Sequence, residues 1–542
     1  MPLARTRAAA IPPAAAGLLL LLLVTGVSLV GHEGSRAARV LAMLVPVFIW
    51  LRWPTASTWW RRLRLVIVSL TLGMFVLDGV VRAYMLDRYQ AVPESAMVLA
   101  AVANTTSREM TEYAQSMGNI LWIGLLGSGV ALCAVFALTG MSGRHQAPLS
   151  RSARWWLIGI LVVCCIAFAG KHWRRYHPTI YWSTWATSVA NLRANWANQE
   201  EERSQLLRNA QKANPRVTSA TTSTVVLVIS DSVNRDNMSL YGYGRSTTPG
   251  LTALSKELEG RWLTLPHAWS TAAGTWASLS GVFSFGQRGQ GAPVGDTQHV
   301  LAIARAAGYQ VWWVSNHDDI AIEQQHGMLA HSVQTINRQP GRGSASLDGD
   351  VLRPLQAALT HPAPRKLIVL HLLGAHPDYR RRAPADLNPF TADDAVDAAM
   401  ARDGRPLWLR KTRLDYDTAI SYHDSVVSET VRLTRQHTPA NGEAAWMYIS
   451  DHGQEVGHSA NRAGHSAATE AGYKIPAMAW RSSKPFPATA AHRTFRADWA
   501  GWLLTDLMNI EWATMEPKRN VLADHYAWEA PHLPLDGVRF DR

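Results

Sequence analysis

Two acidic segments, each directly after an apolar run, carry the residues best suited to chemistry. Residues 224–229 lead into Ser230-Asp231-Ser232, and residues 445–449 lead into Ser450-Asp451-His452-Gly453. Apolar runs of this length favour strands buried on both faces of a parallel sheet, and open α/β sheets bind ligands at the carboxyl ends of such strands. Two carboxylates and an imidazole at that edge suit a divalent metal, although an Asp after a strand can also cap a helix or form a turn.

A third segment, residues 266–284, is rich in hydroxyl groups. Its small residues lead into a helix-like stretch, so Thr275 is expected near a helix N-terminus, where N–H groups and the helix dipole favour a phosphate. A hydroxyl in that position can act as a nucleophile if a metal lowers its pKa. On composition alone, a Ser/Thr-rich helix cap is the simpler interpretation.

The elements that must position these residues alternate along the chain. The pattern predicts helices over 296–307 and 415–434 and strands over 309–315 and 366–373, which implies a mainly parallel sheet with helices on both faces. His376 lies just past the last of these strands. The loop after His452 holds His458 and His465, which suggest anion binding or proton transfer beside a metal site.

The first third of the chain has a different composition. Of 542 residues, 47% are hydrophobic, and the long apolar runs gather before residue 170. Charge-free or nearly charge-free runs at 14–31, 65–86, 119–141 and 155–170 are candidate spans, and 40–51 is a weaker fifth with twelve uncharged residues. We therefore expect a transmembrane domain over 1–170, a linker with membrane-surface helices over 171–216 and a catalytic domain over 217–542.

The weak fifth span decides the topology. If it crosses, the arginines before the first span, between the second and third spans and between the fourth and fifth spans all fall on one side, which is cytoplasmic by the positive-inside rule, and the C-terminal domain is exported. The three cysteines all lie inside proposed spans, so the exported domain has no disulfides or thiolate ligands. A net charge of +12 suits work beside anionic lipid, and no nucleic-acid motif is present. The arginines that decide the topology are Arg5, Arg7, Arg52, Arg61, Arg62, Arg64, Arg144, Arg151 and Arg154. The cysteines are Cys133, Cys164 and Cys165.

Four ordered motifs resemble those of a known family. They are SDS at 230–232 with LYGYGRSTTP at 240–249, GTWASLSGVFS at 274–284, HLLGAHP at 371–377 and SDHGQE at 450–455. Together they resemble the membrane phosphoethanolamine transferases of the sulfatase and alkaline-phosphatase superfamily. The resemblance covers essentially the whole chain. It implies about five α-helical spans in the bacterial inner membrane, followed by an α/β sulfatase-like domain in the periplasm.

The resemblance also implies a reaction and a set of site residues. The reaction moves phosphoethanolamine from phosphatidylethanolamine, through a phospho-threonine intermediate, to an envelope glycolipid or glycan such as lipopolysaccharide core, lipid A or a periplasmic glucan. One or two zinc ions are implied. The implied roles are metal ligands at Asp231, Thr275, Asp451 and His452, with Thr275 as nucleophile; phosphoryl or second-metal binding and leaving-group assistance at His376 and His465; and donor head-group binding at Thr105 and Glu109.

Two departures from the family pattern leave alternatives open. The family usually has Glu where this chain has Asp231, which is one methylene shorter, and the lipid A-modifying members carry cysteines around the threonine motif that this chain lacks. The chain looks more like the members that modify core sugars or periplasmic glucans. The alternatives are a phosphoglycerol transferase or a phosphate or sulfate ester hydrolase of the same superfamily, or a degenerate protein that binds glycolipid without catalysis.

Overall fold

The structure is a computed structural model of the chain. It describes residues 11–32, 34–55, 57–89, 92–94, 98–99, 102, 119–143, 149–287, 297–317, 320–337 and 346–541. The predicted donor-site residues Thr105 and Glu109, and the loop residues Arg5, Arg7 and Arg144, lie outside these ranges. The chain separates into two compact units, Met1–Ala194 and Asn195–Arg542, called here the N-terminal and C-terminal units. The expected boundaries after residues 170 and 216 stay predictions.

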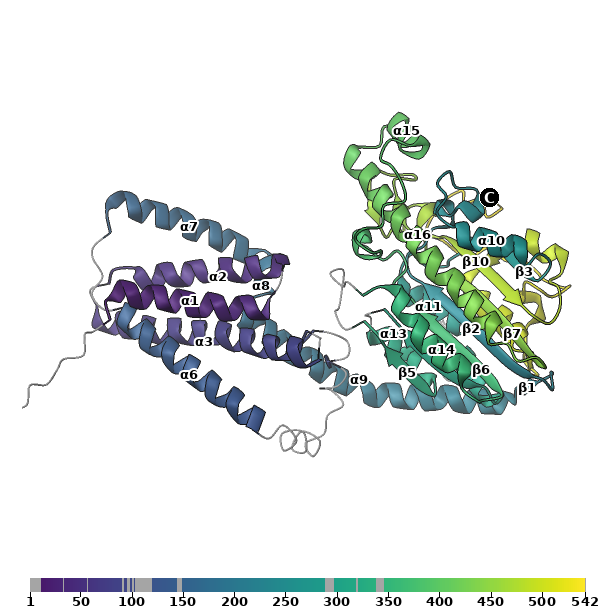
Figure 1. The fold of residues 1–542 in the computed structure, drawn as a ribbon, viewed down its shortest axis with the longest axis horizontal. Coiled ribbons are helices and arrows are strands. Elements are labelled where there is room, and N and C mark those ends of the chain that lie inside the picture. Colours follow the sequence, from purple (N-terminus) through teal and green to yellow (C-terminus); the bar gives the residue numbers. More distant parts are fainter. Residues whose placement is uncertain are drawn as a thin grey trace, which may run out of the picture. The chain divides into compact units, whose positions relative to one another are not determined.

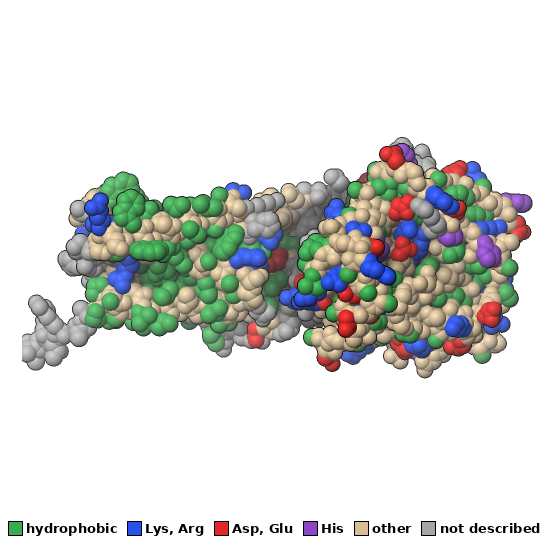
Figure 2. Space-filling view, turned by 90° about the horizontal axis from the view of Figure 1, so that it is seen from above, with side chains coloured by type: hydrophobic (Ala, Val, Ile, Leu, Met, Phe, Trp, Pro, Cys, Tyr) green, Lys and Arg blue, Asp and Glu red, His purple; other side chains and the backbone are tan. Residues whose placement is uncertain are grey.

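The N-terminal unit is helical. Five of its described helices are long and apolar enough to cross a membrane, which agrees with the expected number of spans. Apolar side chains cover its visible face, whereas charged side chains are scattered over the C-terminal unit (Figure 2). The helices of this unit are α1 (Pro13–Gly31), α2 (Gly34–Arg52), α3 (Thr58–Tyr89), α6 (Asn119–Ser142), α7 (Arg151–Ala169) and α8 (Lys171–Arg174). Helix α9 (Pro178–Ala213) begins in this unit and ends in the C-terminal unit.

The weak fifth span is longer than the uncharged run predicted. Helix α2 begins at Gly34, and two arginines in its first turns have partners within the helical unit. Arg36 forms an ion pair with Glu94, and Arg39 donates a hydrogen bond of 3.1 Å to the hydroxyl of Tyr176. After α7 the chain forms the short helix α8 and then α9, a single helix of 36 residues.

A buried ionic cluster lies at the same end of the helical unit as Glu94. Arg82 donates to Asp78 Oδ1 at 2.9 Å and to Glu94 Oε2 at 2.9 Å, and His32 Nε2 lies 2.9 Å from Asp78 Oδ2. The indole of Trp182 on α9 also donates to Asp78 Oδ1 at 2.9 Å. The charges of Asp78 and Arg82, which stand within a predicted span, are therefore compensated inside the protein, as charges in a membrane domain must be.

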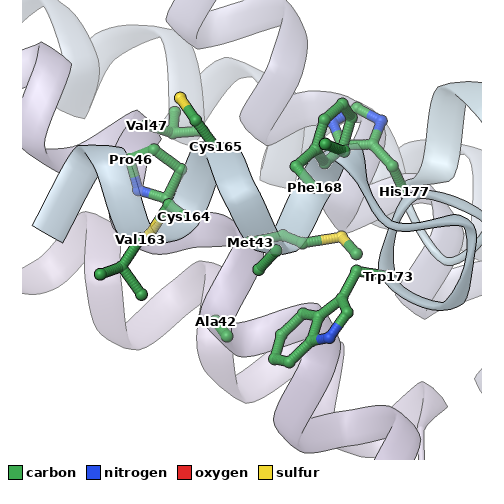
Figure 3. Close-up of a pocket in the computed structure, with 12 residues that line it drawn as sticks. Ala42, Met43, Pro46, Val47, Val163, Cys164, Cys165, Phe168, Trp173 and His177 are labelled. Atoms are coloured by element: carbon green, nitrogen blue, oxygen red, sulfur yellow. The ribbon is translucent and has the colours of Figure 1, made fainter.

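An apolar groove of about 640 Å³ opens between α2, α7 and the segment from α8 to His177 (Figure 3). Its wall is formed by aliphatic side chains, two cysteines and the rings of Phe168, Trp173 and His177. Such a surface suits hydrocarbon rather than water. The lining residues are Ala42, Met43, Pro46, Val47, Val163, Cys164, Cys165, Ala167, Phe168, Ala169, Trp173 and His177.

The C-terminal unit is built on one eight-stranded sheet with the order β11-β3-β10-β7-β2-β6-β4-β5. All neighbouring pairs are parallel except the two made by β10, so the sheet is mixed and mainly parallel, as predicted. Its strands are β2 (Thr222–Ser230), β3 (Trp262–Trp269), β4 (Gln310–Ser315), β5 (Ser332–Thr335), β6 (Arg365–His371), β7 (Gly442–Ser450), β10 (Lys474–Arg481) and β11 (Thr494–Arg496). Short pairs are made by β1 (Arg216–Val217) with β12 (Ile510–Glu511) and by β8 (Glu455–Val456) with β9 (Ala463–Gly464).

Helices cover both faces of this sheet. Alternate residues of β2 pack into two separate cores, one with α10, α14 and α16, which lie over the near face in Figure 1, and one with the end of α9, α11, α12 and α17. The apolar run of β2 is therefore buried on both faces, as the sequence predicted. The α-helices that begin in the C-terminal unit are α10 (Pro249–Glu257), α11 (Thr275–Phe283), α12 (Val300–Ala306), α13 (Ile320–Gln325), α14 (Leu352–Thr360), α15 (Ala395–Arg402), α16 (Leu407–Gln436) and α17 (Ala500–Leu507).

Candidate functional site

The register between the two central strands brings the two predicted acids together. Strands β2 and β7 are parallel with Ser230 opposite Ser450, so Asp231 and Asp451 follow at the same edge of the sheet. The backbone N–H of Asp451 donates to the carbonyl of Ser230 at 2.9 Å, which continues the ladder by one residue. Both carboxylates are fully buried, so two like charges meet where water cannot screen them.

Backbone donors hold one oxygen of Asp451 and leave the other without a partner. Ser232, in the left-handed region with φ of 63°, turns its N–H to Asp451 Oδ1 at 3.0 Å, and the N–H of His452 donates to the same oxygen at 2.6 Å. Oδ2 is buried and has no hydrogen-bond partner in the part of the chain that the structure describes. A buried carboxylate oxygen left in this way fits a cation as its partner.

The ring of His452 is oriented toward the same point. Its Nδ1 lies 2.7 Å from the carbonyl oxygen of Gly453, which can only accept, so Nδ1 carries the proton. Nε2, which offers a lone pair whenever it carries no proton, faces Asp451 Oδ2 at 3.5 Å and Thr275 Oγ1 at 3.4 Å. A histidine fixed by a carbonyl on one nitrogen and free to ligate with the other is the usual arrangement at protein metal sites.

Thr275 is the first residue of α11, as the sequence predicted, with Gly274 as N-cap. Its hydroxyl donates to Asp231 Oδ2 at 2.9 Å. Two neighbouring hydroxyls that could be mistaken for it are engaged elsewhere, because Ser270 and Ser278 both donate to the backbone carbonyl of Asp451. Among these three hydroxyls, Thr275 is the one in contact with the carboxylate of Asp231.

The two other predicted histidines border the same site. The rings of His452 and His465 are 4.6 Å apart between centroids, and those of His376 and His465 are 6.4 Å apart. The loop that carries His376 is held against Asp231, since the N–H of Ala375 donates to the carbonyl of Asp231 at 2.9 Å. Burial, followed by the charge of His452, lowers the pKa of His465 to about 4, so its imidazole is neutral near pH 7.

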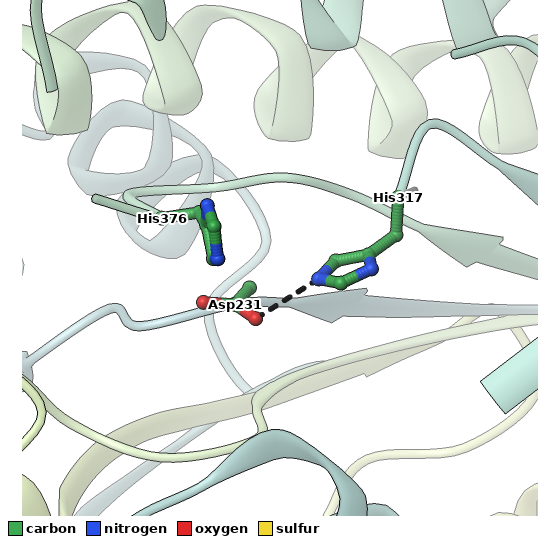
Figure 4. Close-up of side chains that lie close together, drawn as sticks. All are labelled: Asp231, His317 and His376. Carbon is green, nitrogen blue, oxygen red and sulfur yellow. Dashed lines mark hydrogen bonds and ion pairs between the residues drawn. The ribbon is translucent and has the colours of Figure 1, made fainter. Parts of the chain in front are cut away.

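One residue of the site was missed by the sequence analysis. His317 lies two residues past β4, and its Nε2 is 3.1 Å from Asp231 Oδ2, with the rings of His317 and His376 both directed toward that carboxylate (Figure 4). The signal was present in the sequence, because a polar residue just past a predicted strand had already selected Asp231 and His376.

The pKa values of the two buried carboxylates are shifted in opposite directions. Burial, followed by the charge of Asp231, raises the pKa of Asp451 to about 6. Burial also acts to raise the pKa of Asp231, but the hydrogen bond from His317 and the charges of His376 and His452 outweigh it and hold the pKa well below its usual value. A carboxylate pair of this kind, buried and unequal, is stabilised by a bound cation.

The donor atoms fit a metal ion. Oxygens of Asp231 and Asp451 and a nitrogen of His452 lie within 4.8 Å of one another, and the oxygen of Thr275 is beside them. Two carboxylates and an imidazole match zinc, which is bound through nitrogen and oxygen at about 2.0–2.2 Å. Six of the eight predicted site residues therefore meet in one place, and the other two, Thr105 and Glu109, lie outside the described residues.

With the sheet and its acid–histidine edge described, comparison with known proteins identifies the family. The Sulfatase family profile matches residues 223–505, more than half of the chain, and the chain belongs to this family. Several of the relatives it matches are named phosphoethanolamine transferases, which is the group that the sequence motifs predicted. It is 31% identical over 274 residues to phosphoethanolamine transferase EptC of Escherichia coli K12, covering 48% of this chain and 45% of that protein.

Two further similarities extend this comparison. Phosphoethanolamine transferase EptA of Escherichia coli O157:H7 is 22% identical over 468 residues, covering 82% of this chain and 78% of that protein. The crystal structure of the C-terminal periplasmic domain of EptC from Escherichia coli in complex with Zn is 25% identical, with a TM-score of 0.54, and covers 58% of this chain and 90% of that one. The chain spans about half the length of the first curated relatives it matches.

Proposed function

We propose that the protein transfers phosphoethanolamine from phosphatidylethanolamine to a hydroxyl or phosphate of an envelope glycolipid or glycan. The observation that carries the proposal is the Thr275 hydroxyl, 2.9 Å from Asp231 Oδ2 at the start of α11 and bordered by His452. The relatives are named phosphoethanolamine transferases, which supports phosphoethanolamine as the group that is transferred. The helices of the N-terminal unit support a lipid donor, since they hold the chain in a membrane.

The residues that would hold zinc are Asp231, Thr275, Asp451 and His452. When bound there, the ion supplies the positive charge that lowers the pKa of the Thr275 hydroxyl. The Zn complex of the EptC domain supports this choice of metal for the related fold.

The reaction takes two displacements at phosphorus. In the first, the bond between Thr275 Oγ1 and phosphorus forms as the bond to the glycerol oxygen breaks, and diacylglycerol leaves with the proton from Thr275. In the second, the acceptor oxygen attacks phosphorus, the bond to Thr275 breaks, and the acceptor proton returns to the threonine. His376 or His465 would carry these protons, because both imidazoles border the hydroxyl–carboxylate cluster.

The proposed location is the bacterial inner membrane, with the C-terminal unit in the periplasm. Five crossings put the two ends of the helical unit on opposite sides, and the arginine asymmetry puts the N-terminal side in the cytoplasm. The acceptor would then be a molecule of the periplasm or of the outer membrane assembly route.

Peptide mapping by mass spectrometry tests the nucleophile. The purified protein is incubated with phosphatidylethanolamine, and a phosphoethanolamine adduct is expected on the peptide that contains Thr275. Thr275→Ala should abolish the adduct and lower transfer by orders of magnitude, whereas Thr271→Ala, a neighbouring hydroxyl in the same loop, should keep both. An adduct on another residue, or normal turnover by Thr275→Ala, would refute the assignment.

The same reaction mixture separates the transferase from the alternatives. Release of free phosphoethanolamine with water as the only acceptor would indicate a hydrolase. A phosphoglycerol adduct from phosphatidylglycerol would indicate a phosphoglycerol transferase. Mass spectrometry of envelope glycolipids and glycans, with and without the gene, would then identify the acceptor by the gain of one phosphoethanolamine.

A further inference from the structure

The carboxylate of Asp231 belongs to two groups of potential metal ligands. One is the group with Asp451 and His452 described above. The other joins Asp231 to His317 and His376, again with donor atoms within 4.8 Å of one another (Figure 4). We propose that this second group binds a second divalent metal ion, so that Asp231 bridges a pair of metals at the site of the proposed transfer reaction.

The ligand set has the right chemistry for such an ion. Two imidazoles and one carboxylate bind zinc and other borderline divalent metals. Donor atoms that share a metal at bonds of about 2.1 Å lie about 3.4 Å apart in a tetrahedral arrangement. Asp231 Oδ2 and His317 Nε2 are separated by 3.1 Å, so only a small movement is needed to admit the ion.

The ring of His317 is fixed before any ligand arrives. Strand β4 pairs with β6 up to Ser315 opposite His371, and the N–H of Asn316 extends the ladder to the carbonyl of His371 at 2.8 Å. The His317 ring then stacks on His371, with centroids 4.6 Å apart and planes at 15°. A ring that is 5% exposed and packed on one face cannot swing away from Asp231, which is the preorganisation that a ligand requires.

The short side chain of Asp231 explains why His317 is the partner. A carboxylate one methylene shorter than Glu stays close to the end of β2. There the adjacent strands β6 and β4 present His376 and His317 from their own carboxyl ends. The family resemblance pairs His376 with His465 for a phosphoryl group or a second metal. In this structure the ring of His376 is nearer to His317, at 5.7 Å between centroids, than to His465, at 6.4 Å.

The inference gives the three histidines different roles. His317, His376 and Asp231 are the ligands of the second metal. His465, which packs against His452, does not bind this metal and accepts or returns a proton. A second divalent charge held by these residues would also suit the phosphoryl group of the donor, because two-metal sites stabilise the negative charge of a displacement at phosphorus. This inference rests on the proposed function only for the identity of the substrate. The metal count is independent of it.

Metal stoichiometry tests the inference without reference to activity. The full chain, purified in detergent, is saturated with zinc and dialysed, and its zinc content is measured by inductively coupled plasma mass spectrometry. Two zinc ions per chain are expected for the wild type, one for His317→Gln and one for Asp451→Asn. His361→Gln, an exposed histidine of the same unit, is the matched control and should keep two.

Cobalt titration gives a second readout and separates the possible failures. The visible absorption of Co²⁺ should saturate at two equivalents in the wild type and at one in His317→Gln, with unchanged circular dichroism. One equivalent in both proteins would overturn the second site, because His317 would then only orient Asp231, while the first site and the proposed function would stand. No bound metal in the wild type would overturn both.

Discussion

Gly374 offers a way to move Asp231 without changing any ligand. It has a φ of +55°, and a Cβ built on it would lie 2.6 Å from the carbonyl oxygen and 2.9 Å from the nitrogen of Asp231. Contacts of a Cβ below 3.0 Å are essentially never observed, so Gly374→Ala must push the backbone of Asp231 away by about 0.4 Å or more. Metal sites tolerate about 0.2 Å in their ligand distances, so this displacement should be felt by the bound metal.

Gly308 supplies the matched control. Its φ is +88°, and a Cβ there would meet nothing within 4 Å. Both Ala variants carry a left-handed non-glycine residue, which costs about 1–2 kcal/mol in the free energy of unfolding. Only Gly374→Ala should also lose zinc affinity, by about 10–100-fold, the effect of disturbing the groups that orient metal ligands.

The assay compares the two variants directly. Zinc affinity is measured by competition with a chelator, and stability by thermal unfolding of the metal-free protein in detergent. Both variants should lose stability, Gly374→Ala more because its Cβ also meets the backbone of Asp231, and only Gly374→Ala should lose zinc affinity. If Gly374→Ala binds zinc as tightly as Gly308→Ala, the contact does not position Asp231 and the reasoning is wrong.

Three further predictions concern the ion pairs and the topology. Arg245 is buried and donates to Asp394 at 2.6 and 2.9 Å and to the fully buried Asp417 at 2.7 Å, so Arg245→Met should cost about 3–5 kcal/mol by thermal unfolding. Arg435→Met, which breaks the more exposed pair with Glu257, should cost about 0–1 kcal/mol. Burial would raise the pKa of Glu455, but hydrogen bonds from His458 outweigh it and hold the pKa at about 2, against an ordinary value of 4.5. The stabilisation by its charge is therefore complete above pH 4.5 and lost as the pH falls toward 2, so between these values the wild type should lose stability more steeply than Glu455→Gln. A reporter fused after Gly170 should be exported, and cytoplasmic activity would mean that α2 does not cross.

The centre of the sheet and the acids beside it could be predicted from the sequence. Strands β2 and β7 have centres that are apolar on both faces, and each is followed directly by an aspartate; parallel strands bring their carboxyl ends to one edge. The register that sets Ser230 opposite Ser450 could not be predicted in this way, because it depends on packing against both helical layers. His317 could have been found by the rule that selected Asp231, but its distance to that carboxylate depends on how β6 and β4 pair.

The antiparallel part of the sheet could not be predicted for a physical reason. Strand β3 contains Pro266 and β10 contains Pro476, and proline is normally excluded from interior strands because it cannot donate to the ladder. The structure accommodates both prolines at a register shift, where Ile475 pairs with Ala268 but Ala477 pairs with Leu265. The irregularity sits between strands far apart in the sequence, so neither segment alone indicates it.

The strand order has a consequence for how the chain folds. β2 at residues 222–230 pairs only with β6 and β7, which begin at residues 365 and 442. As the chain is synthesised from its N-terminus, the apolar residues 225–229 of β2 have no strand partner until segments more than a hundred residues later have been made. Pairing over such separations is slow and exposes strand edges to other chains. A chain interrupted before Ser450 would therefore leave Asp231 without Asp451 and leave the central strand with an open edge.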